Sequence, residues 1–208
     1  MLRLFSVFAF VLGSLLSTAH ASPVDYDELD ERLTRLASDA EIVGLAVAVI
    51  EDGEIRFAEG YGVTKLGGDP VTPHTVFRWA SLSKGVASTA VGKMAAEGQL
   101  AFSDTISKFK TSLRLPLGGE KVGTLEDLPA HKIGIVPNAY DTRLEDGRDP
   151  AEIRKSLGSL KRTCPVGECH TYQNVAFDAI AEVVAAVRGI SFEETVRLEL
   201  FQPLGMQD

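Results

Sequence analysis

The sequence lacks long hydrophobic runs and has little cysteine. Its early apolar stretch, residues 4–16, is about a dozen residues long, whereas a membrane-spanning helix needs roughly 20. No later stretch qualifies as a transmembrane helix, which excludes a polytopic membrane protein. Two cysteines occur among the 208 residues, so the chain can form one internal disulfide.

A stripe of basic residues is also absent. The chain carries 21 Lys and Arg against 29 Asp and Glu, a formal net charge of −8, and its basic residues are interleaved with acidic ones. This pattern lacks the electrostatic footprint of a nucleic-acid-binding protein. A hydrophobic content of 45% indicates an ordinary globular chain with one sizeable core.

The first residues have the pattern of a secretory signal peptide. Arg3 precedes the apolar run at 4–16, and small residues follow, ending at Ala21. We therefore predict a signal peptide at residues 1–21, a mature domain at residues 22–208, and a secreted or periplasmic protein with no stable membrane span after cleavage. The alternative is that the apolar segment is retained as a membrane anchor. No cysteine lies near the cleavage site, so lipid attachment is not expected there.

The two cysteines, Cys164 and Cys169, enclose a four-residue loop. A local disulfide is one interpretation, because exported proteins fold in oxidising compartments. The alternative, a metal pair, needs further ligands at suitable spacing. His170 is adjacent, but the other histidines are scattered. We predict no metal site and no organic cofactor.

Turn and cap residues divide the chain into an early hairpin and later helices. A helix is predicted at 27–40, and two strands, 44–50 and 54–60, are joined through an Asp-Gly turn. Further helices are predicted at 81–98, from 124, at 175–188 and at 191–201, with a surface loop at 137–150. The fold class is α+β, with an α/β sheet region and a helical region. Two strands do not make a stable sheet alone, so further strands are expected to be missing.

Ser81 and Lys84 form the Ser-x-x-Lys pattern of serine β-lactamases and penicillin-binding proteins. Residues three apart on a helix share a face, so the amine can reach the hydroxyl, and the helix dipole with burial disfavours its ammonium form. The same spacing recurs at Ser107 and Lys110, in a charged surface stretch, so one match is a coincidence. The alternative role of Ser81 is a helix N-cap.

Tyr172 and Asn174 form a second pattern, after the cysteine loop and before a helix. Residues two apart in an extended segment point the same way, so the phenol and the amide can face one cleft. The alternative is a packed tyrosine followed by an N-cap asparagine.

Taken in order, these motifs resemble class C-type β-lactamases, D-alanyl-D-alanine carboxypeptidases and related esterases. Segments 124–131, 164–174 and 203–206 also resemble this family, so the resemblance covers essentially the mature chain. It implies a β-lactamase/transpeptidase-like fold, an acyl-enzyme on Ser81, proton transfer shared by Lys84 and Tyr172, and an Asn174 that binds the substrate amide.

The chain departs from the family pattern after Tyr172, where no Lys-Thr-Gly or His-x-Gly motif follows. Lys121-Val-Gly123 precedes Tyr172 and is in the wrong order for that motif. In the family the third motif lies on a strand whose backbone N–H helps to form the oxyanion hole. One such hydrogen-bond donor typically raises turnover about 100- to 1,000-fold. We therefore expect a fold incomplete at the C-terminus, truncated before this motif.

The resemblance implies a serine hydrolase that acts on β-lactams, D-alanyl peptides or esters. Its partner would be a small-molecule or peptidoglycan-peptide substrate, and not nucleic acid. The alternative is a catalytically inactive cell-wall-binding protein, or a fragmentary protein, of the same family.

Overall fold

The computed structural model describes residues 24–206, so the predicted signal peptide at 1–21 lies outside the described residues. The chain divides into two compact units, Met1–Val76 and Phe77–Asp208. The first holds a helix and a hairpin and the second holds helices and turns, which confirms the α+β prediction. Within residues 24–206, no helix is long and apolar enough to cross a membrane.

The hairpin of the first unit is built around a two-residue turn. Strands β1 (Gly44–Glu51) and β2 (Glu54–Gly62) pair antiparallel, with Glu51 opposite Glu54. Asp52 and Gly53 lie between them with φ angles of 52° and 79°, the left-handed conformation that a tight hairpin turn requires at both positions. The predicted Asp-Gly turn is confirmed.

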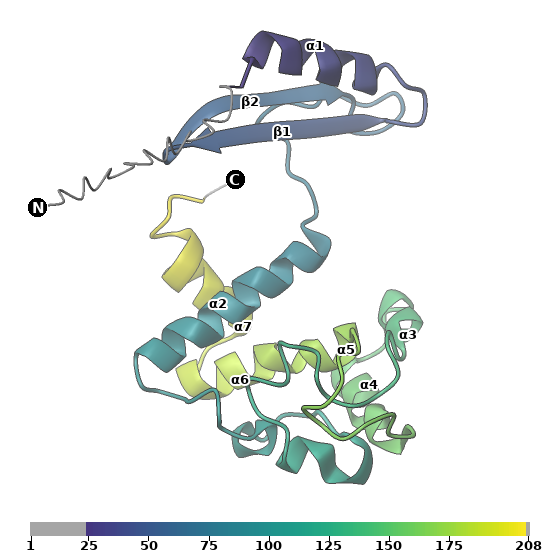
Figure 1. The fold of residues 1–208 in the computed structure, drawn as a ribbon, viewed down its shortest axis with the longest axis vertical. Helices are drawn as coiled ribbons and strands as arrows, with labels where there is room; N and C mark the ends of the chain where they lie inside the picture. The colour runs from purple at the N-terminus through teal and green to yellow at the C-terminus, as the bar shows by residue number, and fades with distance from the viewer. Residues whose placement is uncertain (1–23, 207–208) are drawn as a thin grey trace, which may run out of the picture. The chain divides into compact units, whose positions relative to one another are not determined.

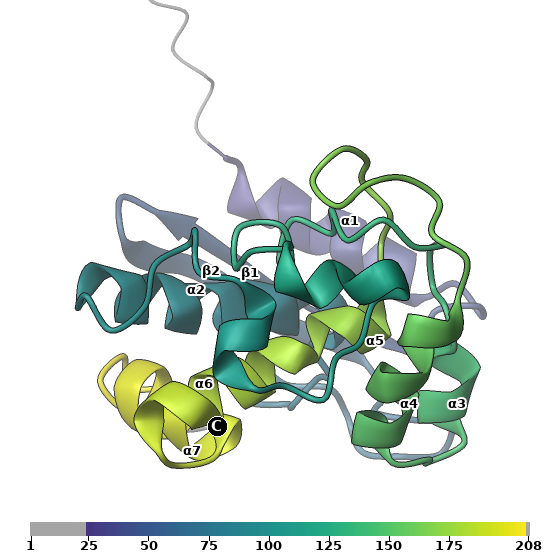
Figure 2. The same ribbon diagram turned by 90° about the horizontal axis from the view of Figure 1, so that it is seen from below.

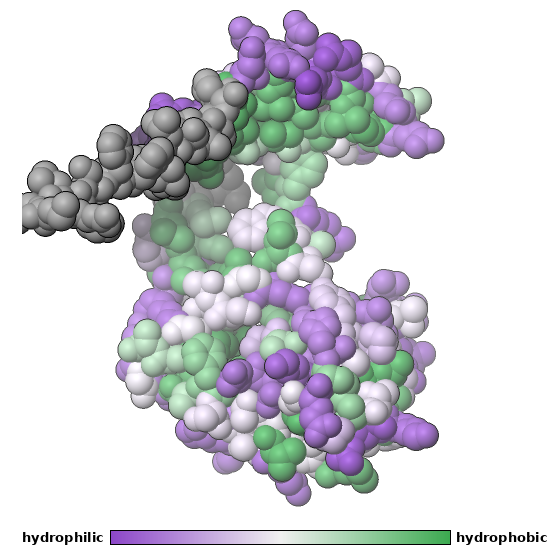
Figure 3. Space-filling model, in the orientation of Figure 1, coloured by the Kyte–Doolittle hydropathy of each residue, from purple (hydrophilic) through white to green (hydrophobic). Residues whose placement is uncertain are grey.

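Helix α1 (Tyr26–Ala37) covers one face of this hairpin (Figure 1). The Asp25 carboxylate caps it by accepting from the Glu28 N–H at 3.0 Å. The Tyr26 hydroxyl donates to Glu51 of β1 at 2.6 Å, and its ring stacks on Phe57 of β2 with centroids 5.9 Å apart. Figure 3 shows hydrophilic residues on the outer side of α1 above a hydrophobic layer, as expected for an amphipathic helix.

Helices α2 (Ser83–Ala96) and α6 (Ala179–Arg188), which Figure 2 shows among the other helices, contact each other and contribute to the core of the second unit, together with residues of the turns between them. Both helices present buried side chains to this core: Ala87, Ala90, Val91, Met94, Ile180, Val183 and Val184. Gly98 and Gly189 have φ angles of 73° and 74° just after the two helices, in the conformation that ends a helix. The predicted helix ends are therefore confirmed.

Shorter elements complete the second unit. Helices α5 (Asn174–Phe177) and α7 (Phe192–Val196) flank α6, and the Ser191 side chain caps α7 by accepting from the Glu194 N–H. Two further helices, α3 (Asp141–Glu145) and α4 (Pro150–Ser156), follow the middle of the chain. The remaining helical segments are 3₁₀ or π turns at Ala80–Leu82, Ile106–Phe109, Pro116–Lys121, Leu157–Ser159 and Arg197–Phe201.

Two local predictions are wrong. The capping contacts predicted at 124–127 do form, since the Asp127 N–H donates to Thr124 Oγ1 and the Thr124 N–H to Asp127 Oδ2. No helix follows them, because Pro129 has no N–H to extend one, and the segment is a series of turns. Residues 137–150 are also not only surface loop, since they contain α3 and the buried Ala139.

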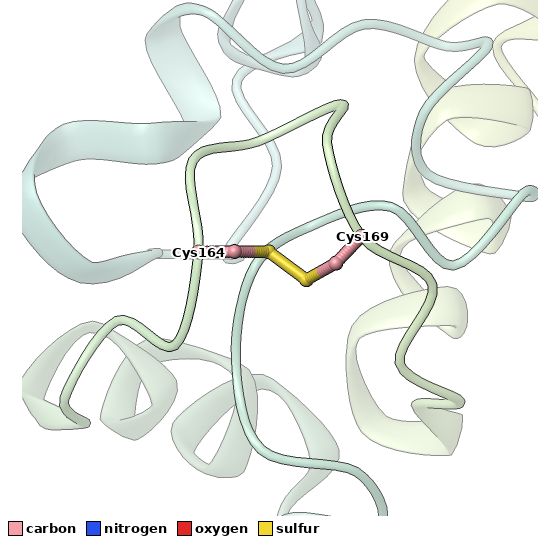
Figure 4. Close-up of a disulfide and its surroundings, with 2 residues drawn as sticks. All are labelled: Cys164 and Cys169. Carbon is pink, nitrogen blue, oxygen red and sulfur yellow. A yellow bond between two sulfur atoms is a disulfide. The ribbon is translucent and has the colours of Figure 1, made fainter.

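The loop between Cys164 and Cys169 is closed in the structure by a bond between the two sulfur atoms (Figure 4). Backbone hydrogen bonds hold this loop to residues 131–134: the Thr163 N–H donates to the Gly134 carbonyl and the Thr171 N–H to the His131 carbonyl. Gly134 has a φ of 74°, and a Cβ there would lie 2.3 Å from the Cys164 carbonyl oxygen. The close approach therefore requires glycine, and it fixes the segment that leads to residue 172.

Candidate active site

Ser81 lies in the 3₁₀ turn Ala80–Leu82, which leads directly into α2. The preceding residue, Ala80, has a φ of 46°, a left-handed conformation that is unfavourable for a residue with a Cβ. Such strain is characteristic of functional sites and persists only where the surrounding fold imposes it. The turn leaves Ser81 exposed at the start of α2.

Lys84 follows one helical turn later on the same face. Its Nζ lies 3.2 Å from Ser81 Oγ, as the three-residue spacing predicted. The amine also lies 4.7 Å from the centroid of the Tyr172 ring and 5.4 Å from that of Phe177. Both distances lie within the range of cation–π contacts.

Tyr172 reaches Ser81 from the segment that connects the cysteine loop to α5. Its hydroxyl oxygen lies 2.6 Å from Ser81 Oγ. The intervening Gln173 is extended and fully buried, and its Nε2 donates to the Val136 carbonyl at 2.6 Å. With Gln173 anchored in the core, Tyr172 and Asn174 point together to the other side. The predicted pairing of the two side chains is therefore observed.

Asn174 uses both ends of its amide. Its Oδ1 accepts from Lys84 Nζ at 2.6 Å, and its Nδ2 donates to Asp141 Oδ2 at 2.7 Å. Its side chain therefore does not cap α5, where the N-cap position belongs to Gln173. Sequence reasoning missed Asp141, because it lies in the segment interpreted as surface loop and carries no motif.

His131 lies beneath Tyr172, with ring centroids 4.5 Å apart. It is buried, and its Nδ1 accepts the Gln173 N–H at 3.2 Å. Burial, followed by the charge of Lys84, lowers the pKa of His131, which favours a neutral imidazole. His131 thus packs against the Tyr172 ring. Among the described residues, no hydrogen bond joins His131 to Ser81. The sequence marked it only as part of a family-like segment.

The environment of Tyr172 favours its ionised form. Hydrogen bonds from Lys84 and then Ser81 lower the pKa of its phenol below the ordinary value of 10.0. Burial and the carboxylate of Asp141 act in the opposite direction. The phenolate that this lowered pKa makes more accessible can accept the proton of the neighbouring serine hydroxyl and become a phenol.

A cavity of about 390 Å³ opens beside Lys84 and Asn174, within the range typical of ligand pockets. Mostly apolar side chains line it, with two carboxylates at its wall: Ala87, Leu144, Phe177, Phe192, Asp178 and Glu193. Ala80 and Ser83, which lie close to Ser81 along the chain, also line this cavity.

The second Ser-x-x-Lys match has different surroundings. Ser107 is exposed in the 3₁₀ turn Ile106–Phe109, and its hydroxyl lies 3.3 Å from Thr105 Oγ1. Among the described residues, it is Ser81 that hydrogen-bonds to both a lysine and a tyrosine. Lys121, from the Lys-Val-Gly sequence that precedes Tyr172, lies in another 3₁₀ turn. Across residues 24–206, no group of three His, Cys, Asp or Glu side chains could hold a metal ion.

Comparisons with known proteins follow the same pattern. Residues 29–208 match the model of the Beta-lactamase family. The chain is 29% identical over 216 residues to the D-alanyl-D-alanine-carboxypeptidase/endopeptidase AmpH of Escherichia coli K12, which covers 97% of this chain and 56% of AmpH. It is 26% identical over 196 residues to the esterase EstB of Burkholderia gladioli, which covers 86% of this chain and 50% of EstB.

Among solved structures, a class C β-lactamase matches with a TM-score of 0.74 at 24% identity, over 88% of this chain and 49% of that chain. This likeness shows the β-lactamase-type fold that the resemblance implied. The chain spans about half the length of the curated relatives it matches. The resemblance inferred from the ordered motifs is confirmed, and the chain belongs to the Beta-lactamase family.

Proposed function

We propose that this chain carries the nucleophile and the proton-transfer groups of a serine hydrolase that works through an acyl-enzyme. The observation that supports this most directly is the position of Ser81 Oγ, 2.6 Å from the Tyr172 hydroxyl and 3.2 Å from Lys84 Nζ. A nucleophile within hydrogen-bond reach of a base, itself oriented by a third group, is the arrangement of activated serines.

In the proposed reaction, Ser81 Oγ bonds to the carbonyl carbon of the substrate while its proton passes to the Tyr172 oxygen. Lys84 Nζ donates to Ser81 Oγ, so the serine's own hydrogen is directed towards the phenol. The lowered pKa of Tyr172 favours the phenolate that accepts this proton. The proton then moves to the leaving group as the scissile bond breaks. Water hydrolyses the resulting ester by the reverse sequence of proton transfers.

We propose that Asn174 binds the substrate in addition to accepting a hydrogen bond from Lys84. An asparagine amide has two N–H groups, and Asp141 takes one of them. The second N–H is available for the carbonyl of a substrate side-chain amide. The cavity of about 390 Å³ adjoins this position and would accept that side chain.

The substrates we propose are β-lactams, D-alanyl peptides or simple esters, each attacked at an acyl carbon. The names of the relatives cover a carboxypeptidase, an esterase and a β-lactamase. We assign the same four side chains of this chain to each of these reactions. The reaction needs no metal ion or organic cofactor, because the nucleophile is activated by side chains alone. This chain spans about half the length of these relatives. Catalytic turnover by a complete enzyme of that length is therefore proposed along with the substrates.

We also infer that the domain, residues 22–208, acts after export to the periplasm or the medium. The leader-like residues 1–21 and the pair of cysteines support this location. The proposed substrate, a small molecule or a peptidoglycan peptide, is present in the same compartments.

The test is covalent labelling by a penicillin. Purified chain is incubated with benzylpenicillin, and its intact mass and tryptic peptides are measured. We expect one adduct with the mass of the intact penicillin, on the peptide that contains Ser81, and no adduct on the Ser81→Ala variant. Ser107→Ala is the matched control, because it removes the serine of the second Ser-x-x-Lys pattern, and it should label as the wild type does.

Absence of an adduct on the wild-type chain would overturn the proposal. Reversible penicillin binding without an adduct would instead support the inactive, binding-only alternative. An adduct that persists in Ser81→Ala would show that another nucleophile reacts.

A further inference from the structure

Asp141 stands at the end of a continuous series of hydrogen bonds that begins at the serine. Ser81 Oγ accepts from Lys84 Nζ at 3.2 Å, Lys84 donates to Asn174 Oδ1 at 2.6 Å, and Asn174 Nδ2 donates to Asp141 Oδ2 at 2.7 Å. Asp141 is the first residue of α3, an element distant in sequence from both α2 and α5.

The chemistry of these groups allows one orientation of the amide. An ionised carboxylate only accepts hydrogen bonds and a lysine ammonium only donates them. An amide placed between the two must therefore turn its NH₂ towards the carboxylate and its oxygen towards the lysine. We propose that Asp141 is a positioning residue, which fixes the orientation of the Asn174 amide and thereby holds Lys84 beside Ser81. This inference rests on the proposed function, in which Lys84 assists proton transfer.

The reversed amide would disturb the site twice. It would direct N–H groups at Lys84, a donor facing donors, and it would direct its oxygen at the Asp141 carboxylate, an acceptor facing an acceptor. Lys84 would lose its 2.6 Å hydrogen bond and would be free to leave the serine. Without Asp141, the contact with Lys84 alone would oppose the reversed orientation.

The burial of Asp141 provides a second, independent observation. Its other oxygen, Oδ1, is buried and has no hydrogen-bond partner among the described residues. A buried polar atom without a partner opposes folding, so the carboxylate is not explained by its contribution to stability. The contact that the structure gives this carboxylate is the hydrogen bond that Oδ2 accepts from Asn174.

The pKa of Tyr172 can separate two effects of Asp141: the positioning of Lys84 through Asn174, and the direct effect of the Asp141 charge. The charged or titratable groups that act on or lie against its phenol are Ser81 and Lys84 from the start of α2, Asp141 from α3, and His131, whose ring also contacts that of His170. Lys84 is the largest influence that lowers the Tyr172 pKa, whereas the charge of Asp141 raises it. Loss of the Asp141 charge alone would therefore lower this pKa, but displacement of Lys84 would raise it.

The experiment follows the ¹³Cζ resonance of Tyr172 through a pH titration of the full chain labelled with [¹³Cζ]tyrosine, assigned with Tyr172→Phe. We expect Asp141→Ala to raise the Tyr172 pKa. In an Asn174→Ala background the same substitution should cause no further rise, because Asp141 acts through Asn174. Asp146→Ala is the matched control, since it removes an exposed carboxylate at the other end of α3 and should leave the titration unchanged.

Labelling of Ser81 by benzylpenicillin gives the second measurement. We expect Asp141→Ala to slow it roughly 10- to 100-fold, the size expected when a reacting group is misplaced, and Asp146→Ala to leave it unchanged. If the wild-type chain is not labelled at all, the proposed function fails, and the tyrosine titration still decides the role of Asp141.

A fall or no change in the Tyr172 pKa in Asp141→Ala would overturn the positioning role. An equal effect of Asp141→Ala with and without Asn174 would also overturn it. Thermal unfolding monitored by circular dichroism checks that each variant folds, and Asp141→Leu, which has a similar volume but no acceptor for the Asn174 N–H, replaces the alanine variant if that one does not. In Asp141→Leu a rise in the pKa supports the role and a fall rejects it.

Discussion

Tyr172 shows how several neighbours define the chemistry of one residue. Its ring lies on His131, its hydroxyl contacts Ser81 Oγ at 2.6 Å, and Lys84 lies 4.7 Å from its ring centroid. Packing holds the ring in place, while the hydrogen bonds lower the pKa of the phenol. Packing and acidity can be separated, because removal of the hydroxyl leaves the ring.

We predict that Tyr172→Phe slows labelling of Ser81 by benzylpenicillin about 100- to 10,000-fold, the usual contribution of a general base. Since the phenolate is the active form, the wild-type rate should rise as the pH rises through the lowered Tyr172 pKa, below 10.0, and this rise should vanish in the variant. The measurement is the labelling rate between pH 6 and pH 11. Tyr140→Phe, at the nearest tyrosine in the sequence, should keep the wild-type profile. An unchanged rate in Tyr172→Phe would assign the proton transfer to another group.

At the scale of elements, the turns at 124–131 and the segment 171–174 form one support for the site. The Thr171 N–H donates to the His131 carbonyl at 2.9 Å, and the Gln173 N–H donates to the His131 ring at 3.2 Å. Sequence patterns predicted the hairpin, α1 and the ends of α2 and α6, since Asp-Gly, caps and glycines act locally. They failed at 124–131, where Pro129 prevents a helix, and at α3, whose position depends on contacts with distant segments.

Because His131 is part of this support, we expect the free energy of unfolding to depend on pH. The pKa of His131 in the folded chain lies below its ordinary value of 6.5, so the folded state binds fewer protons at this site than the unfolded state. Its contribution to the free energy of unfolding is therefore present above pH 6.5 and is lost as the pH falls through the folded pKa. The slope from this single group is at most about 1.4 kcal/mol per pH unit.

Urea denaturation between pH 8 and pH 5 measures this dependence. We expect His131→Phe, which keeps an aromatic ring but cannot titrate, to show a smaller loss of stability over this window than the wild type. Equal slopes in wild type and His131→Phe would remove His131 as the cause.

At the scale of the whole molecule, all the side chains of the candidate site lie in the unit Phe77–Asp208. Ser81, Lys84, Asp141, Tyr172 and Asn174 come from three separate stretches of this unit. The bond between Cys164 and Cys169 closes the loop just before Tyr172. Export to an oxidising compartment would therefore affect the site directly.

We predict that the chain produced with its leader in a bacterial host is exported and begins at Ser22, with no free thiol. Amino-terminal sequencing and alkylation under denaturing conditions, followed by mass measurement, test both points. The matched control is a chain that begins at Ser22 and is made in the cytoplasm, which should show two alkylated thiols. A secreted chain that still contains Met1, or one with two free thiols, would contradict the export proposal.

The sequence by itself determined the local structures and the chemical groups of this protein: the Asp-Gly hairpin, the helix ends at Gly98 and Gly189, and the serine, lysine, tyrosine and asparagine in order. These follow from backbone conformations and spacings within a few residues. The sequence already favoured Ser81 over Ser107 by its setting, and the tertiary structure added the hydrogen bonds of Ser81, the contact with Asp141 and the packing of His131 against Tyr172. The reason is physical, since a hydrogen bond between residues about 30 to 90 positions apart depends on how distant segments pack, which no local pattern records.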